Sequence, residues 1–260
     1  LMGFRIFLLP VVLLLQFSIT GYAQETSWRN WLSANASYDI NKDWRVSAGH
    51  LRSYEISNKY LNSFNQFRFG TSYDITKRIG ISAGVQWMTL PSSPGTRTRV
   101  FLMGDHTTRI ARKINWTNSL QVETNSSAEK RFRHRIVLGT RLSPRKRLDF
   151  LNLSPSVSYR LFYNIGGNPV SYYDPEGNLL ARQSPDGFHR HRLQLNANSK
   201  ISDLLRINLY FMMQREFNFL SSDTRKINIP NRTKTSTIRP FDNYNVIGLS
   251  LNLDINELIK

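Results

Sequence analysis

The clearest strand pattern in the chain is QFRFGTSYDITKRIGISAGVQW, residues 66–87. Apolar residues such as Phe67, Phe69 and Tyr73 alternate with polar or small ones, and the same alternation resumes after the turn residues 76–78. A period of two places apolar side chains on one face of a strand and polar side chains on the other. This stretch therefore predicts a hairpin of two long amphipathic strands.

The same period recurs on both sides of this hairpin, and no segment predicts a helix. The expected strands lie at about 28–40, 44–54, 66–75, 79–87, 98–110, 114–124, 131–142, 148–163, 188–201, 205–219 and 243–256. One additional hairpin is expected at Val170–Arg182, inside a connection rich in Gly, Pro and Asn. The chain is therefore expected to be all-β.

The connections between these strands alternate in length. The short ones are 41–43, 76–78, 111–113, 143–147 and 202–204, and the longer ones are 55–62, 91–97, 125–130, 164–187 and 220–240. Outer-membrane barrels combine short periplasmic turns with longer external loops, and their strands need about 9–11 residues to cross the membrane. The pattern predicts an antiparallel transmembrane β-barrel. Because single-chain bacterial barrels have even strand numbers, we expect about twelve strands, with ten as the second choice, although eleven can be counted.

The first 23 residues are expected to be a signal peptide. Arg5 precedes an apolar run from Ile6 to Ile19, and the small-residue site Gly21-Tyr22-Ala23 follows. Such a run is too short to span a bilayer well and fits an export signal. We therefore expect residues 24–260 to form a single barrel domain in the cell outer membrane.

Net charge and cysteine content limit the kinds of site and partner that the protein can have. The chain has a net charge of +17 and no cysteine. Without cysteine there is no disulfide and no thiolate metal site. A basic surplus favours anionic solutes, acidic membrane surfaces or nucleic acid, and export argues against nucleic acid. No phosphate-binding glycine loop is present, so no cofactor is expected.

Many arginines fall on the polar, inward-facing positions of the expected strands. They are Arg68, Arg99, Arg109, Arg131, Arg133, Arg135, Arg160, Arg190, Arg192 and Arg206. Possible counter-charges on the same faces are Asp74, Asp105, Glu123 and Glu216. Two interpretations follow. The arginines and carboxylates form a network that plugs the lumen, or the arginines line a pore that favours small anions.

Aromatic residues on the apolar faces gather near strand ends, where amphipathic rings prefer the membrane interfaces. The expected interface aromatics are Tyr38, Trp44, Tyr73, Trp87, Trp116 and Tyr163.

Histidines near the long connections allow two hypotheses. His134 and His191, with Lys130, could contact phosphates of lipid A, or they are interface residues whose polar ends reach water. A lipid hydrolase is an alternative function, because His and Ser can form a catalytic triad, but no triad motif is apparent. His189 and His191 have a metal-chelating spacing but no acidic neighbour, so no metal site is expected.

Three segments resemble a known family. They are WRNWLSANASYDINKDWRVSAGHLR (28–52), RFRHR (131–135) and LSPSVSYRLFYN (153–164). Together they resemble the family catalogued as domain of unknown function 2490, common in Bacteroidetes, and the resemblance covers the whole expected mature chain. It implies an outer-membrane barrel of unknown role and no catalytic residues.

We therefore expect a non-enzymatic barrel that is either a structural or interaction platform or a basic-lumen pore for small anions. As a platform it would use the connections 164–187 and 220–240. The basic connection 220–240 could also bind lipopolysaccharide.

Overall fold

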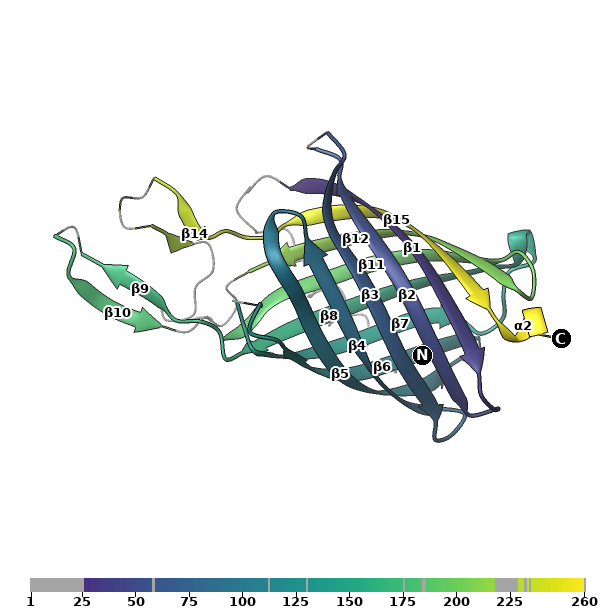
Figure 1. Cartoon of the computed structure of the whole chain (residues 1–260). Helices are drawn as coiled ribbons and strands as arrows, with labels where there is room; N and C mark the ends of the chain where they lie inside the picture. The colour runs from purple at the N-terminus through teal and green to yellow at the C-terminus, as the bar shows by residue number, and fades with distance from the viewer. Residues whose placement is uncertain are drawn as a thin grey trace.

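The protein folds into a closed barrel of eleven long strands (Figure 1). The computed structural model describes residues 26–57, 59–111, 113–129, 131–174, 176–183, 186–217, 229–231, 233 and 235–259. The expected signal peptide, Lys130 and most of 220–240 lie outside these described residues. Among the described residues, no helix is long and apolar enough to cross a membrane.

The barrel strands follow the predicted segments closely. They are β1 Ser27–Asp39, β2 Trp44–Glu55, β3 Leu61–Asp74, β4 Ile79–Leu90, β5 Ser93–Ile110, β6 Ile114–Asn125, β7 His134–Pro144, β8 Leu153–Ile165, β11 Gly187–Lys200, β12 Leu205–Glu216 and β15 Tyr244–Asp254. Outside the barrel lie β9 Val170–Tyr173, β10 Leu179–Gln183, β13 Ile229–Pro230, β14 Thr237–Arg239, a 3-10 turn Phe150–Asn152 and α2 Asn256–Ile259.

The strand number corrects the expectation of twelve or ten. Around the barrel every pair of neighbours is antiparallel except β1 and β15, which pair in parallel from Ser27–Tyr244 to Ser37–Asp254. β1 and β15 both start at the end of the barrel that carries the long connections, so they run in the same direction. A parallel pair at this position allows an odd number of strands to form a closed barrel. The eleven described strands close the barrel by themselves.

The two ends of the barrel differ. In Figure 1 α2 and the C-terminus lie at one end, and the β9–β10 hairpin and β14 project from the other. The short turns at the α2 end are held by side chains: Asn41 Oδ1 accepts the backbone N–H of Trp44 at 2.9 Å, and Thr76 Oγ1 accepts that of Ile79 at 3.0 Å. Such side-chain caps stabilise a tight turn. We name these ends the turn end and the loop end.

Several element boundaries differ from the prediction, and β3 starts at Leu61 instead of 66. β8 starts at Leu153 instead of 148, because the 3-10 turn and a Leu148–Leu153 bridge occupy the residues before it. β5 starts at Ser93, so the connection expected at 91–97 is much shorter. β7 starts at His134, which leaves Arg131 and Arg133 in the connection from β6. The predicted hairpin at 170–182 is confirmed as β9–β10.

Alternation sorts side chains between the two barrel surfaces. Large apolar residues such as Phe67, Leu102 and Leu209 are exposed on the outside, and most of the polar alternates point into the lumen. Because the strand period is two, this sorting follows directly from the sequence pattern.

Candidate functional site

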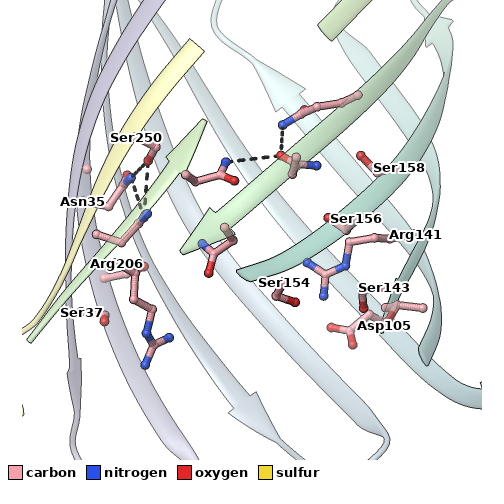
Figure 2. Close-up of a pocket in the computed structure, with 18 of the residues that line it drawn as sticks. Asn35, Ser37, Asp105, Arg141, Ser143, Ser154, Ser156, Ser158, Arg206 and Ser250 are labelled. Atoms are coloured by element: carbon pink, nitrogen blue, oxygen red, sulfur yellow. Dashed lines mark hydrogen bonds between the residues drawn. The ribbon is translucent and has the colours of Figure 1, made fainter. Parts of the chain in front are cut away.

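The turn-end half of the lumen contains a polar cavity of about 870 Å³. Its wall is formed mainly by side chains near the turn ends of the strands. They include Asn35, Ser37, Arg45, Arg68, Asp105, Arg141, Arg147, Ser154, Ser156, Ser158, Arg160, Gln194, Asn196, Asn198, Arg206, Asn208, Ser250 and Asn252 (Figure 2). Hydroxyl, amide and guanidinium groups thus dominate this wall.

Amides and hydroxyls line one continuous arc, from β8 through β11, β12 and β15 to β1. Asn196 Oδ1 accepts from Gln194 Nε2 at 2.7 Å and from Asn208 Nδ2 at 3.3 Å. On the other side of the arc, Asn35 Nδ2 donates to Ser250 Oγ at 2.9 Å (Figure 2). These bonds hold the amides in fixed orientations, so the arc presents preset donors and acceptors to the cavity.

Three arginines of the cavity have no acidic partner. Among the described residues, Arg68, Arg141 and Arg160 form no ion pair and donate no hydrogen bond. The Arg68 guanidinium lies 4.4 Å above the Phe101 ring. Arg160 is repelled by the charges of both Arg68 and Arg141. Since positive charges removed from bulk water need compensation, this group of three can bind an anion.

The remaining cavity arginines are held by the protein itself. Arg45 Nε donates to Asp39 Oδ1 at 2.5 Å, and Arg206 lies 3.7 Å from Asp254. Arg147 Nη1 donates to the carbonyl of Asn152 at 2.8 Å, which anchors the β7–β8 turn. These residues therefore stabilise the turn end.

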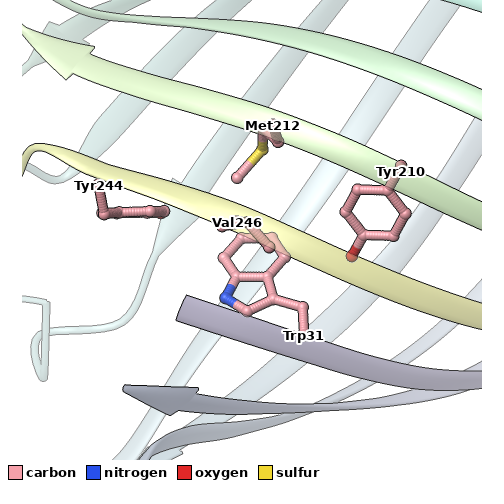
Figure 3. Packing of buried hydrophobic residues seen from close by; sticks show 5 residues of the cluster. All are labelled: Trp31, Tyr210, Met212, Tyr244 and Val246. Carbon is pink, nitrogen blue, oxygen red and sulfur yellow. The ribbon is translucent and has the colours of Figure 1, made fainter. Parts of the chain in front are cut away.

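Buried side chains gather in the loop-end half of the lumen. Trp31, Tyr210, Met212, Tyr244 and Val246 form a buried cluster (Figure 3). All five alternate with outward residues on β1, β12 and β15, so they point inward. We call this cluster, together with the ion pairs described next, the plug.

Glycines make room for the plug. A Cβ on Gly248 would lie only 2.0 Å from the Tyr210 ring, and one on Gly84 would lie 2.7 Å from that of Phe101. These rings therefore occupy space that any larger residue on the neighbouring strand would fill.

Ion pairs surround the aromatic part of the plug. Glu123 accepts from Arg135 at 2.6 Å and lies 3.3 Å from Arg99. Glu216 pairs with Arg190 and lies 3.9 Å from Arg131. The cations at this end are thus compensated, in contrast to the three in the cavity.

A further set of contacts ties the plug to the connection before β15. Arg192 and the Tyr244 hydroxyl both donate to Gln214, at 2.7 and 2.8 Å. Asp242 in that connection accepts from Arg29 at 3.0 Å. Burial opposes ionisation of Asp242, but the charges of Arg29 and nearby arginines hold the pKa of this carboxyl below its usual value.

The ten predicted inward arginines separate into groups. Arg68, Arg160 and Arg206 line the cavity, and the plug contains Arg99, Arg131, Arg135, Arg190 and Arg192. Arg109 lies exposed at the turn end of β5, and Arg133 is exposed in the β6–β7 connection.

The predicted counter-charges are divided in the same way. Glu123 and Glu216 belong to the plug, and Asp105 lines the cavity. Asp74 lies beside Asp105, since both carboxylates flank the position of a Cβ on Gly80.

Sequence analysis missed several inward residues. Arg45, Arg141 and Arg147 line the cavity, and Trp31 and Tyr210 fill the plug. Strict alternation could have found the two aromatics, because Trp31 shares the face of Arg29 and Ser33. Both side chains are largely apolar, so they were not expected on the polar, inward-facing side of their strands.

The two histidines of the lipid A hypothesis have protein contacts. His191 is buried, with its ring 5.6 Å from that of Tyr159 and 5.5 Å from that of Phe217. His134 Nδ1 lies 3.1 Å from Thr124 Oγ1. Burial of His191 argues against a phosphate contact there. No group of three His, Cys, Asp or Glu residues suited to a metal occurs in the described part of the chain.

The predicted interface aromatics lie near both ends of the barrel. At the turn end Tyr38 and Trp44 are exposed, the rings of Trp44 and Tyr73 are 5.5 Å apart, and Trp116 Nε1 donates to Thr140 Oγ1 at 2.7 Å. Near the loop end lie Trp87, which is exposed, and Tyr163, whose ring is 4.9 Å from that of Phe188.

Comparisons with known proteins identify a family and similar solved structures. The model of the family described as "Protein of unknown function (DUF2490)" matches residues 28–225. No curated protein matches the sequence. Among solved structures, a crystal structure of OccD1 (OprD) is similar, with 11% identity and a TM-score of 0.31, over 71% of this chain and 49% of that chain. The chain thus spans about half the length of that protein.

Proposed function

Since the chain belongs to the DUF2490 family, whose function is unknown, we propose a role from the geometry of its own lumen. The protein is an outer-membrane β-barrel that offers small anionic solutes a basic pathway. The pathway is entered at the turn end and is closed at rest by the plug. The observation that carries this proposal is the cavity in which Arg68, Arg141 and Arg160 form no ion pair with any described carboxylate.

The outer surface of the barrel supports a membrane location. Phe67, Leu102 and Leu209, on β3, β5 and β12, are 57%, 61% and 54% exposed. Soluble proteins rarely expose contiguous apolar patches of more than a few hundred Å². Lipid around the barrel would cover these side chains, which the folded chain leaves in contact with solvent.

The two groups of aromatics support the same location. Tyr38 and Trp44 near the turn end, and Trp87 towards the loop end, are exposed on the outer surface. Amphipathic rings are enriched where hydrocarbon meets headgroups and water. Two such bands would therefore mark the two membrane interfaces.

Orientation follows from the connections. In outer-membrane barrels the short turns face the periplasm and the longer loops face outward. The cavity would then face the periplasm, and the β9–β10 hairpin would face the exterior. The plug would separate the cavity from the exterior.

The charge of the cavity supports anions as the solute. Rings of arginine in a lumen attract anions. Six arginines but only one carboxylate, that of Asp105, are found on the cavity wall. The field inside the cavity would therefore favour negative solutes.

We also propose that the barrel has no catalytic role. A lipid hydrolase needs a histidine that is hydrogen-bonded to a nucleophile and oriented by a third polar group. Among the described residues no carboxylate is hydrogen-bonded to His134, which contacts the Thr124 hydroxyl, and His191 is enclosed between the rings of Tyr159 and Phe217. Binding of lipopolysaccharide stays a prediction, because most of the basic residues of 220–240 lie outside the described residues.

Single-channel recording in a planar bilayer, with a salt gradient across it, tests the proposed function. We expect the refolded protein to insert and to show infrequent steps that favour anions, because the plug closes the loop end. Large permanent steps would contradict the closed state, and cation preference would contradict the anion pathway. A protein that stays in solution and never inserts would contradict the membrane location.

A further inference from the structure

The wall of the cavity has two chemically different parts. Arg141 and Arg160 lie on the adjacent strands β7 and β8, and Arg68 reaches in from β3, which is four strands from β7 around the barrel. The arc from β8 to β1 carries neutral donors and acceptors instead. A ligand that satisfies both parts needs a negative group and several neutral polar groups.

The arginine group fits an oxyanion. Guanidinium groups bind carboxylate and phosphate through paired hydrogen bonds, which are stronger than neutral ones. Among the described residues none of the three guanidiniums forms an ion pair or donates a hydrogen bond, although Arg68 lies over the Phe101 ring, and the charges of Arg68 and Arg141 repel that of Arg160. Bound phosphate or carboxylate would relieve that repulsion and supply the missing acceptors.

The neutral arc fits hydroxyl groups. Ser154, Ser156 and Ser158 occupy alternate positions of β8, and Gln194, Asn196 and Asn198 do the same on β11. Hydroxyl and amide side chains both donate and accept hydrogen bonds, as sugar hydroxyls do. Successive inward residues of one strand are about 6.6–6.8 Å apart, so two adjacent strands provide a grid of polar groups over the length of a sugar ring.

Size and access fit the same ligand. The cavity of about 870 Å³ falls within the range of about 300–1,000 Å³ typical of small-molecule sites. Arg99, Arg135 and Arg190 at the loop end are already paired with carboxylates. Uncompensated positive charge is therefore found towards the turn end, where a ligand would enter.

From this juxtaposition we infer that the cavity is a binding site for a phosphorylated or carboxylated sugar, held by Arg68, Arg141 and Arg160 at its anionic group and by the β8–β11 serines and amides at its hydroxyls. The inference rests on the proposed anion pathway and adds its substrate class.

Calorimetric titration of the refolded protein with four probes tests the inference. The probes are glucose 6-phosphate, glucuronate, inorganic phosphate and glucose. We expect at least one of the two sugar anions to bind about tenfold or more tightly than inorganic phosphate, because several additional hydrogen bonds form. Glucose should bind weakest, since it lacks the charge. The sugar anion that binds shows whether phosphate or carboxylate is the group recognised.

Two variants separate the two parts of the wall. Arg141→Gln/Arg160→Gln should weaken binding of the sugar anion and of inorganic phosphate by about tenfold or more. Ser154→Ala/Ser156→Ala/Ser158→Ala should remove the preference for the sugar anion and leave phosphate binding unchanged. The serine variant keeps every charge, so phosphate binding that it retains shows that the arginine part of the cavity is still folded.

The outcomes distinguish this inference from the proposed function. Equal binding of inorganic phosphate and both sugar anions would overturn the sugar site and leave the anion pathway intact. Unchanged sugar preference in the serine variant would also overturn it. Loss of anion preference in the bilayer recording, with no probe bound, would overturn the proposed function itself.

Discussion

At the scale of single residues, the lumen is controlled by whether each inward charge has a partner. Glu123 compensates both Arg135 and Arg99, and all three side chains lie within the plug. Arg160 points into the same lumen and has no such partner in the described chain. Inward arginines of one barrel therefore act in two ways, as structural cations in the plug and as free cations in the cavity.

The first prediction concerns Glu123. Glu123→Gln leaves two buried guanidiniums uncompensated, and breaking a buried pair in this way costs about 3–5 kcal/mol. We expect lower stability in denaturant titration and more frequent channel opening. Asp203→Asn makes the same chemical change in the exposed Lys200–Asp203 pair, where about 0–1 kcal/mol is expected. Equal effects of both substitutions would show that the buried pairs do not hold the plug.

The second prediction concerns Gly248. In Gly248→Ala the new methyl group would meet the Tyr210 ring, so the ring or the strand must move, at a cost of about 1–3 kcal/mol. Denaturant unfolding followed by tryptophan fluorescence measures this loss. Gly104→Ala is the matched control, because nothing lies within 4 Å of its Cβ position. If Gly248→Ala unfolds at the same denaturant concentration as Gly104→Ala, the close contact with Tyr210 is not required.

At the scale of elements, the seam between β1 and β15 sets the topology. Side chains of β1 reinforce it: Asn30 Nδ2 donates to the carbonyl of Ile247 at 3.1 Å, and Asn35 Nδ2 donates to Asn252 Oδ1 at 3.0 Å. Parallel pairs are slightly less stable per residue than antiparallel ones. The added side-chain bonds therefore strengthen the one parallel seam of the barrel.

The third prediction tests this seam by crosslinking. The chain has no cysteine, so introduced pairs are the only thiols. In the parallel register Leu32 pairs with Leu249 and Ala36 pairs with Leu253, and directly paired residues are close enough for a disulfide. Both double-cysteine variants should crosslink on oxidation, as seen by gel mobility. Leu32→Cys/Leu253→Cys should not, and crosslinking of that pair alone would indicate an antiparallel seam.

At the scale of the whole molecule, the lumen is divided along the barrel axis. The turn-end half is a polar cavity and the loop-end half is the plug. Both halves come from the same strands: β1, β12 and β15 contribute polar residues to the cavity near their turn ends and Trp31, Tyr210, Met212, Tyr244 and Val246 to the plug nearer their loop ends. On the proposed pathway, a solute entering the cavity would meet the buried side chains of the plug.

The fourth prediction concerns this asymmetry. A cysteine at Ser156, in the cavity, should react with a membrane-impermeant maleimide added to the turn side of a reconstituted membrane and not with one added to the loop side. A cysteine at Met212, buried in the plug, should react from neither side. Labelling of the Ser156 position from both sides would show that the plug does not close the lumen.

The sequence alone predicted the strands, their inward and outward faces, the β9–β10 hairpin and the turn positions. These features are local, because a period of two and a turn tripeptide are visible in a single segment. The family was also identified from three strand segments, and the family match over residues 28–225 confirms it. Errors at the starts of β5, β7 and β8 arose where a turn or bridge replaced part of the pattern.

Tertiary structure decided how the barrel closes and which inward arginines are free. Strands pair through backbone hydrogen bonds, which every residue can form, so the sequence does not reveal that β1 pairs with β15 in parallel. The prediction of twelve or ten strands was therefore wrong, although eleven strands could be counted in the sequence. Pairing of Glu123 with Arg135 depends on the register between β6 and β7. Arg160 lies opposite Gly139 of β7 and forms no ion pair among the described residues. The sequence thus determined the chemistry of each face, and the register between strands determined which charges meet.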